Sequence, residues 1–536
     1  MIKVTCLGGA GSVTGSNYLI ENVLGKKVLV DCGMFQGGKQ MEIRNIRPWD
    51  FDPSQISTLF LTHAHIDHSG RIPKLVKDGF KGRIITSPPT AELCEIMLLD
   101  SAHIQEMDAL WQTRKNKRRS NKGVEPLYTT DDAVKSLRLL SPVERDEIIE
   151  VDEGIRARLR NAGHILGSSI LELWVQEGSQ EIKLVFSGDI GKANQLILKD
   201  PQNVFNADFL FVESTYGNRL HKTYEDSKKE LLSAIKYAVS NKEKIIIPAF
   251  AVERTQEILY ILGEFYRSGD LPDIPIYLDS PLAIKATEIF KRNRQYYDDE
   301  ATEIVKKGFD PFDMPSLRCT PDTKDSIAIN EKPGSAIVIA GNGMCTAGRI
   351  KHHLKHNLWR EGASLVIVGF QAQGTTGRQI VEGKKTVKIF REDVAVRARV
   401  FTIGGFSAHA DQNDLLRWVG NFAESKPRVF VVHGEASASL ELSRLIADRL
   451  KLKTYVPSWR ESLILKPREI PIEVAAAKDE EVMFAEDMIQ VYAEVESELN
   501  RLRWRIHRAE NKDRITDDDI DRLRYIQEEI RQILMV

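Results

Sequence analysis

The stretch LTHAHIDHSG, residues 61–70, places three histidines and one aspartate within six positions. The whole chain of 536 residues has only 12 histidines, so three of them are not expected to cluster by chance. The preceding run STLFL is apolar and rich in strand-forming residues, which predicts a β-strand. The four polar side chains therefore lie on a loop at a strand end, where functional sites are often built: His63, His65, Asp67 and His68.

The bulk composition is that of an ordinary globular protein with two or more domains. Apolar residues make up 42% and charged residues 28% of the chain, and the net charge of −2 neither requires nor excludes a nucleic-acid partner. No signal-peptide pattern and no membrane-spanning stretch is present, so we expect a cytoplasmic protein with no membrane partner. The five scattered cysteines predict neither a disulfide framework nor a cysteine-based zinc site: Cys6, Cys32, Cys94, Cys319 and Cys345.

The pattern of expected elements changes along the chain. Short strands dominate the first 80 residues and return in residues 155–188. From about Phe209 apolar strands alternate with helical segments, which is typical of a parallel sheet covered by helices. After about Val387 the strand-rich pattern returns, as a third unit or as the first domain resuming after an insertion. From about Asp479 the pattern is helical, and we expect a helical hairpin packed on the body or on a partner subunit.

The spacing of the histidine cluster favours two metal ions over one. Imidazole and carboxylate are common zinc ligands, and His63 and His65, two apart on an extended segment, can face one ion together. Four ligands on one short loop are more easily shared between two ions, which lie roughly 3.5–4 Å apart in known two-metal sites. Each ion then needs ligands from elsewhere. Three residues on turns after other strands can supply them: His164, Asp189 and His433.

The order of these motifs resembles a known family. HxHxDH, followed by His164 and Asp189, resembles the metallo-β-lactamase fold, and its first motif is matched by Asp31 in VLVDCG. Three further motifs resemble those of its β-CASP branch: Glu213 in FVESTYG, His409 in GFSAHAD and His433 in VVHGE. The chain is thus similar to β-CASP ribonucleases related to the nuclease subunit of the cleavage and polyadenylation specificity factor. The resemblance covers about residues 1–465, without the KH extension of archaeal members.

This resemblance implies an α/β fold with three parts. A metallo-β-lactamase αββα sandwich would comprise residues 1–208 and 390–470. A β-CASP domain with a mainly parallel sheet and flanking helices would be inserted at residues 209–389. A C-terminal helical extension would follow at residues 471–536.

The resemblance also implies a centre with two Zn²⁺ ions per subunit. One ion would be held by His63, His65 and His164, the other by Asp67, His68 and His433, with Asp189 bridging the two. Asp31 would orient a ligand from behind, as ligating histidines usually require. The catalytic residues implied in this way are Asp67, Asp189, Glu213 and His409.

The function implied is a zinc-dependent ribonuclease that hydrolyses single-stranded RNA in RNA processing or decay. His409 would be the general acid, paired with Glu213, and a histidine at the position of His433 accompanies RNA substrates in this family. Cleavage would be endonucleolytic, 5′-to-3′ exonucleolytic or both. The alternatives are a hydrolase of small thioesters or lactones and a catalytically silent RNA-binding subunit. A homodimer is compatible with the family and with the apolar helical tail.

Weaker signals concern contacts with substrate. GGAGSVTGS, residues 8–16, has Thr14 where the third glycine of GxGxxG belongs and is followed by a second strand, so we expect no nucleotide cofactor. Ser407, Arg349 and Arg378 are candidate contacts to RNA phosphates. The basic run RKNKRRSNK, residues 114–122, has the charge to attract RNA, although a solvated loop explains it equally well.

Overall fold

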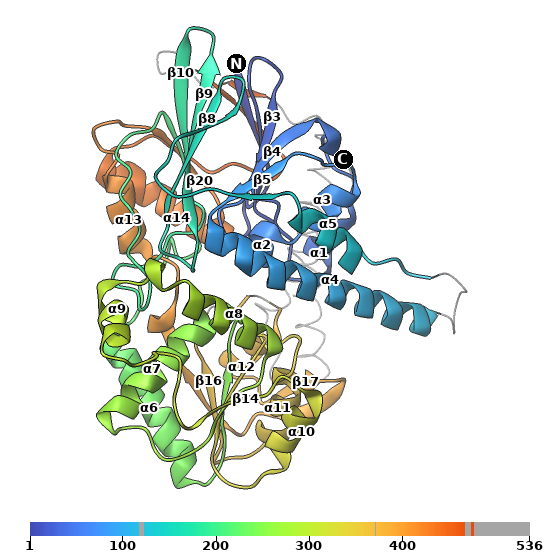
Figure 1. Ribbon diagram of the computed structural model, residues 1–536, viewed down its shortest axis with the longest axis vertical. Coiled ribbons are helices and arrows are strands. Elements are labelled where there is room, and N and C mark those ends of the chain that lie inside the picture. The colour runs from blue at the N-terminus through green and yellow to red at the C-terminus, as the bar shows by residue number, and fades with distance from the viewer. Residues whose placement is uncertain (117–122, 370, 373, 467–472, 476–536) are drawn as a thin grey trace, which may run out of the picture. The chain divides into compact units, whose positions relative to one another are not determined.

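The computed structural model describes residues 1–116, 123–369, 371–372, 374–466 and 473–475, which belong to one compact unit, Met1–Ala475 (Figure 1). Most of the predicted helical extension and of the basic run lies outside the described residues, so both stay predictions. Residues 473–475 form a strand that pairs with Ser462–Leu465. The first domain therefore continues past residue 471, where the extension was predicted to begin.

Two sheets lie face to face in the upper part of Figure 1. The first has the order β23-β22-β1-β2-β3-β4-β5-β6 and the second β21-β20-β11-β10-β9-β8-β7. The first sheet consists of β1 (Ile2–Gly8), β2 (Asn17–Glu21), β3 (Lys27–Val30), β4 (Ile56–Phe60), β5 (Arg83–Thr86), β6 (Leu140–Pro142), β22 (Ser462–Leu465) and β23 (Glu473–Ala475). The second consists of β7 (Ile149–Asp152), β8 (Ile155–Asn161), β9 (Ser169–Glu177), β10 (Gln180–Phe186), β11 (Phe209–Val212), β20 (Arg428–Val431) and β21 (Thr454–Tyr455).

Helices cover the outer face of each sheet and give the predicted αββα sandwich. Side chains of α3, α4 and α5 pack on the first sheet, and those of α13 and α14 pack on the second. Asp411 begins α13 with a capping box, which satisfies backbone N–H groups of the first turn. The helices of the sandwich are α1 (Lys39–Ile46), α2 (Ile66–Ser69), α3 (Ile72–Lys77), α4 (Pro88–Asn116), α5 (Thr130–Leu137), α13 (Gln412–Gly420) and α14 (Ala436–Leu445, continued by a π-helical turn, Ile446–Leu450).

A stack of phenylalanines fills the space between the two sheets. Phe186, Phe211 and Phe430 come from the neighbouring strands β10, β11 and β20. The ring of Phe211 lies between the other two, with centroids 4.4 and 4.7 Å apart and interplanar angles of 9° and 22°. All three rings are buried against apolar side chains of the first sheet. Offset stacking and burial together make this cluster a major contribution to the stability of the sandwich.

The inserted domain is built on a six-stranded sheet in which every strand pair is parallel, as predicted. Its order is β14-β13-β15-β12-β16-β19. Along β12, Ile245 and Ile247 face one set of helices and Ile246 faces the other, so both faces are covered. The strands are β12 (Ile245–Pro248), β13 (Ile276–Leu278), β14 (Leu317–Cys319), β15 (Ile337–Ala340), β16 (Ser364–Ile367) and β19 (Arg399–Thr402), with a hairpin of β17 (Thr386–Ile389) and β18 (Glu392–Ala395).

The helices of the insertion divide between the two faces of this sheet. Side chains of α6, α7 and α8 pack on one face and those of α10, α11 and α12 on the other. The helices are α6 (Tyr224–Ser240), α7 (Arg254–Ser268), α8 (Pro281–Arg292), α9 (Asp299–Lys306), α10 (Thr323–Glu331), α11 (Ile350–Asn357) and α12 (Thr376–Val381). The short helical turns are Pro53–Gln55 in the sandwich, Arg294–Tyr296 in the insertion and Gly404–Phe406 between β19 and α13.

The predicted limits of the insertion, residues 209–389, differ from the strand pairing at both ends. β11 begins at Phe209 but pairs with β10 and β20 in the sandwich. β19 pairs with β16, so the sheet of the insertion extends to Thr402. The sequence does not separate these ends, because buried parallel strands of the two domains have the same apolar pattern and only the pairing distinguishes them.

Two smaller expectations concern the N-terminal loop and the membrane. Residues 8–16 connect β1 to the antiparallel strand β2, which confirms that a strand and not a helix follows the glycine-rich segment. Within the described residues, no helix combines the length and the apolarity that crossing a bilayer requires.

Replacing Phe211 by alanine is expected to lower the free energy of unfolding by about 3–5 kcal/mol, because it removes the central ring of a buried stack. Urea denaturation followed by far-UV circular dichroism measures this change. Phe205→Ala is the control, since its side chain is 63% exposed and its loss should change stability by no more than about 0.5 kcal/mol. Equal midpoints for the two variants would contradict the assignment of the core.

Candidate metal centre and active site

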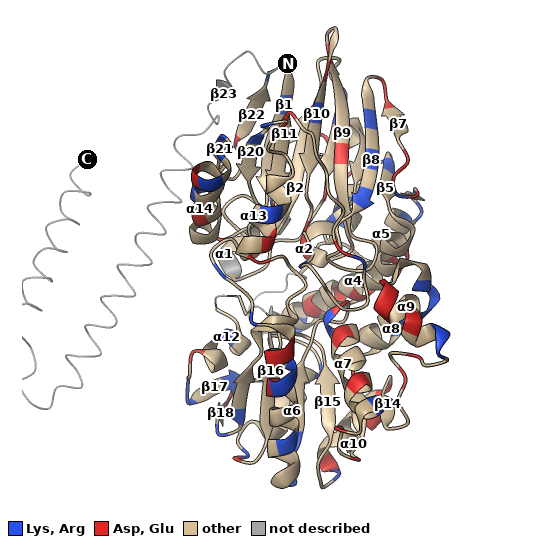
Figure 2. Cartoon of the chain, turned by 90° about the vertical axis from the view of Figure 1, so that its left-hand side faces the viewer, with Lys and Arg blue, Asp and Glu red and all other residues tan. Residues whose placement is uncertain are grey.

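The histidine cluster lies between the end of β4 and α2. In Figures 1 and 2, α2 lies at the end of the sandwich that faces the insertion. His63 and His65 follow the strand directly, and His65 precedes the short helix α2, which carries Asp67 and His68. The backbone of Asp67 packs against Gly33, where a Cβ atom would lie 1.6 Å from the Asp67 carbonyl oxygen. Glycine at position 33 therefore allows α2 to lie against the end of β3.

Three other strands of the sandwich bring the remaining candidate ligands to the same place. His164 follows β8 and Asp189 follows β10, and these two strands run in the same direction because each pairs antiparallel with β9. His433 follows β20, which runs parallel to β10 through β11, and has a left-handed backbone with φ of 47°. The structure thus brings together all seven residues predicted to be metal ligands.

The first group of ligand atoms belongs to His63, His65, His164 and Asp189. The Nδ1 of His65 lies 3.2 Å from Nε2 of His63 and 3.3 Å from Nε2 of His164. The Oδ2 of Asp189 lies 3.5 and 3.6 Å from the same two Nε2 atoms. Ligands of a tetrahedral zinc with bonds of about 2.0–2.1 Å are about 3.3–3.4 Å apart, so this group has the size of a zinc site.

The second group belongs to Asp67, His68 and His433. Asp189 also faces this group, through its other oxygen: Oδ1 lies 3.3 Å from Nε2 of His68 and 3.5 Å from Nε2 of His433. One carboxylate thus presents one oxygen to each group. This is the arrangement expected of a residue shared by two ions.

The pKa values of His63 and His65 also fit cation binding. Burial and the neighbouring histidines hold the pKa of His63 well below its ordinary value, and burial lowers that of His65 to about 4. Neutral imidazoles offer a lone pair to a metal. The Nε2 of His68 and the Oδ1 of Asp189 are buried 3.3 Å apart, and neither forms a hydrogen bond of ordinary geometry among the described residues. Buried polar atoms seldom lack a partner, and a cation held between these two would satisfy both.

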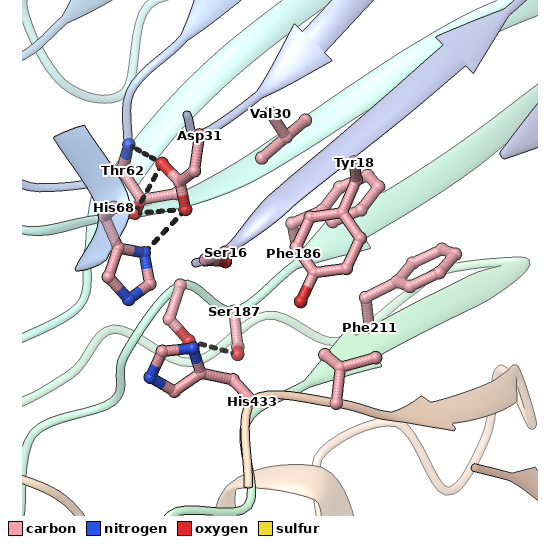
Figure 3. A pocket seen from close by; sticks show the side chains of 12 residues that line it. Ser16, Tyr18, Val30, Asp31, Thr62, His68, Phe186, Ser187, Phe211 and His433 are labelled. Carbon is pink, nitrogen blue, oxygen red and sulfur yellow. Dashed lines mark hydrogen bonds and ion pairs between the residues drawn. The ribbon is translucent and has the colours of Figure 1, made fainter. Parts of the chain in front are cut away.

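Asp31 fixes the orientation of His68 (Figure 3). Its Oδ2 lies 2.7 Å from Nδ1 of His68, and its Oδ1 accepts the backbone N–H of Thr62 at 2.8 Å. The hydroxyl of Thr62 lies 3.0 Å from both carboxylate oxygens. With Nδ1 engaged by Asp31, the Nε2 of His68 faces the centre. Thr62 is a supporting residue that sequence reasoning missed, because a lone threonine at a strand end carries no distinctive signal.

Glu213 and His409 form a pair beside the first group. The Nδ1 of His409 lies 3.3 Å from Oε1 of Glu213, which also accepts the backbone N–H of Ile190 at 2.7 Å. Burial lowers the pKa of His409, but the carboxylates of Glu213 and Asp189 outweigh this and raise the pKa above its ordinary value. The glutamate is fully buried, whereas the imidazole is 21% exposed. The imidazole of His409 is therefore the exposed end of the pair.

The open side of the centre is marked by partial exposure. His65, Asp67 and His409 are partly exposed, whereas His63 and Asp189 are buried. His221, also missed from the sequence, supports the open side with its Nε2 3.0 Å from the carbonyl oxygen of His409. Among the described residues, these partly exposed side chains form the side of the centre that is open to solvent.

The three residues predicted to contact the substrate lie in different surroundings. Ser407 lies beside the pair, and its Oγ accepts the backbone N–H of His409 at 3.3 Å. Arg349 instead points into the insertion, where it donates to Asp279 at 2.8 Å and to the carbonyls of Thr320 and Pro321. Because these partners occupy its guanidinium, the structure does not support the predicted phosphate contact of Arg349.

Arg378 lies on α12 and donates from Nε to Glu382 at 2.7 Å, one turn further along the same helix. This surface ion pair leaves its phosphate contact a prediction. Of the basic run, residues 117–122 lie outside the described residues.

Three family models match consecutive parts of the chain. The metallo-β-lactamase superfamily matches residues 10–249, the β-CASP domain residues 255–380, and the Zn-dependent metallo-hydrolase RNA specificity domain residues 393–457. The match to the β-CASP domain lies within the inserted six-stranded domain.

Several curated proteins are similar over most of their length. Ribonuclease TTHA0252 of Thermus thermophilus is 38% identical over 449 residues, which cover 84% of this chain and 96% of that protein. Transcription termination factor FttA of Thermococcus kodakarensis is 32% identical, with 87% and 72% covered. The RNase J-like protein of Methanocaldococcus jannaschii is 30% identical, with 85% and 98% covered. The chain therefore belongs to the β-CASP ribonucleases, the Zn-dependent hydrolases of the metallo-β-lactamase fold that were expected from its motifs.

Proposed function

We propose that this protein hydrolyses single-stranded RNA at a centre of two zinc ions formed by His63, His65, Asp67, His68, His164, Asp189 and His433. The observation that carries the proposal is the division of these ligand atoms into two groups that share Asp189. When bound, two zinc ions lower the pKa of a water nucleophile and offset the charge that develops on the phosphate.

His409 is proposed as the general acid. With Nδ1 held by Glu213, its Nε2 is the nitrogen free to give a proton to the leaving oxygen of the phosphodiester. Glu213 fixes the tautomer and the ring orientation, and it is itself fixed by the N–H of Ile190. Its carboxylate also keeps the imidazole protonated, since it raises the pKa of His409.

RNA as substrate is supported by the RNA specificity domain match, which includes both His409 and His433. The alternative of a small thioester or lactone hydrolase is not favoured, because the relatives that match this chain over most of its length include a ribonuclease and an RNase J-like protein. A silent RNA-binding subunit is also not favoured, because no ligand or proton donor of the centre is replaced. The mode of cleavage and a homodimer remain predictions from the resemblance.

Asp189→Ala is expected to lower RNA hydrolysis at least about a thousandfold, because one substitution removes a ligand from both ions and with it about 4 kcal/mol of transition-state stabilisation. The assay uses end-labelled single-stranded RNA and DNA of one sequence, with and without chelator. We expect chelator-sensitive cleavage of RNA only, and the fragment ladder separates internal from terminal attack.

The control is Asp393→Asn, an exposed carboxylate in β18, which should cleave as the native protein does. Circular dichroism checks that both variants are folded. Undiminished cleavage by Asp189→Ala would contradict the two-metal centre. Cleavage of DNA at the same rate as RNA would contradict the proposed substrate.

His409→Ala is expected to lower kcat by about 10²–10⁴-fold while zinc content stays at the native level, because the imidazole transfers a proton and holds no ion. Zinc is measured by inductively coupled plasma mass spectrometry and kcat by RNA cleavage. His356→Ala, an exposed histidine of α11, is the control. Loss of zinc from His409→Ala would make His409 a ligand and not an acid.

Asp31→Asn is expected to weaken zinc binding at the second group by about 10–100-fold, because the neutral amide no longer fixes the imidazole of His68 as strongly. Competition with a chromophoric chelator measures the affinity. Thr62→Ser, which keeps the hydroxyl that bonds Asp31, is the matched control and should bind zinc normally. An unchanged affinity in Asp31→Asn would show that His68 needs no support from this carboxylate.

A further inference from the structure

Glu253, at the start of α7 in the insertion, has a strained backbone. Its φ is 67° and its ψ is −60°, and the N–H of Arg254 donates to the carbonyl of Val252 at 2.9 Å. This is a γ-turn of the positive-φ kind, which is rare and strained for a residue with a Cβ atom. Such strain persists where surrounding contacts impose it and is often found at functional sites.

The side chain of Glu253 leaves the insertion and enters the sandwich. It is 1% exposed, and its Oε2 accepts the backbone N–H of Leu166 at 3.2 Å. Its Oε1 accepts from Nε2 of Gln195 at 3.3 Å, and the same nitrogen donates to the carbonyl oxygen of His164 at 3.1 Å. The carboxylate thus holds the loop of His164 at two points, directly and through Gln195.

His164 depends on its backbone for orientation more than His68 does. The ring of His68 is fixed by Asp31, whereas the Nδ1 of His164 forms no hydrogen bond of ordinary geometry among the described residues, with the backbone of Ala408 as a weaker polar neighbour. Ligating histidines are normally oriented through their second nitrogen. Where that bond is weak, the position of the main chain decides where Nε2 points.

The segment after His164 also packs against the insertion. Leu166 and Val252 belong to one apolar cluster. Near Gln195, the strand-like pair Leu198–Tyr297 and the hydrogen bond from the N–H of Asp298 to the carbonyl of Ile197 join the two domains. The segments that carry Leu166 and Gln195, the two partners of Glu253, therefore both contact the insertion.

We propose that Glu253 is a positioning residue through which the inserted domain holds the ligand His164 in place. The proposal rests on the zinc centre proposed above. It makes the first group of ligands a product of both domains, although every ligand in it comes from the sandwich. The strained turn directs the carboxylate across the domain boundary, and the contacts with Leu166 and Gln195 offset the strain.

The test compares Glu253→Ala, Glu253→Gln and the control Gln256→Ala in the full zinc-loaded chain. Gln256 is fully buried in the same helix, but among the described residues its amide donates only to Ala251 and Thr287, both within the insertion. Zinc release to a chromophoric chelator is measured by stopped flow. RNA cleavage gives kcat and KM, and thermal unfolding gives stability.

We expect Glu253→Ala to release one of the two ions about 10–100-fold faster and to lower kcat with little change in KM. Glu253→Gln keeps one acceptor oxygen and should release that ion at an intermediate rate. If the alanine variant does not fold, the glutamine variant carries the test. Gln256→Ala should lose stability yet release zinc as the native protein does.

Native zinc release and native kcat in both Glu253 variants, with only a lower melting temperature, would overturn the proposal and leave a structural contact. The same measurements on the native protein distinguish failure of this proposal from failure of the proposed function. Native protein that holds two ions but cleaves no RNA contradicts the function and leaves the release test valid. Native protein that holds no zinc overturns both.

Discussion

The buried carboxylate of Asp189 is the group on which the arrangement of the site depends. It is 2% exposed and faces the imidazoles of His63 and His164 through one oxygen and those of His68 and His433 through the other. An unpaired charge at this depth would cost several kcal/mol, so positive charge must converge on it from both sides. In the proposed centre, two bound zinc ions would supply that charge.

The convergence follows from the topology of the sandwich. The candidate ligands follow β4 of the first sheet and β8, β10 and β20 of the second sheet. The three strands of the second sheet run in the same direction and end at the same edge. The stacked rings of Phe186, Phe211 and Phe430 hold the sheets together, and Figure 3 shows the first two beside Asp31, His68 and His433. Packing between the sheets therefore sets the distance between the candidate ligands that follow β4 and those that follow the strands of the second sheet.

The family resemblance predicted the fold class and the grouping of the ligands, and local signals in the sequence identified the candidate ligands themselves. HxHxDH is one loop, and His164, Asp189 and His433 each follow an apolar run. Domain limits rest instead on strand pairing, which is not local: β11 and β19 have similar apolar patterns but belong to different sheets. The hydrogen bond of Arg349 was missed for a related reason, since nothing in its own segment indicates that Asp279, 70 positions away, accepts from its guanidinium.

The insertion is part of the centre and not only a cover over it. His409 enters the site from the segment that returns from the insertion, and Glu253 reaches the loop of His164 from α7. Contacts such as that of Arg292 with Glu92 of α4 fix the same boundary at its surface. A metallo-β-lactamase sandwich without this insertion would lack both contacts.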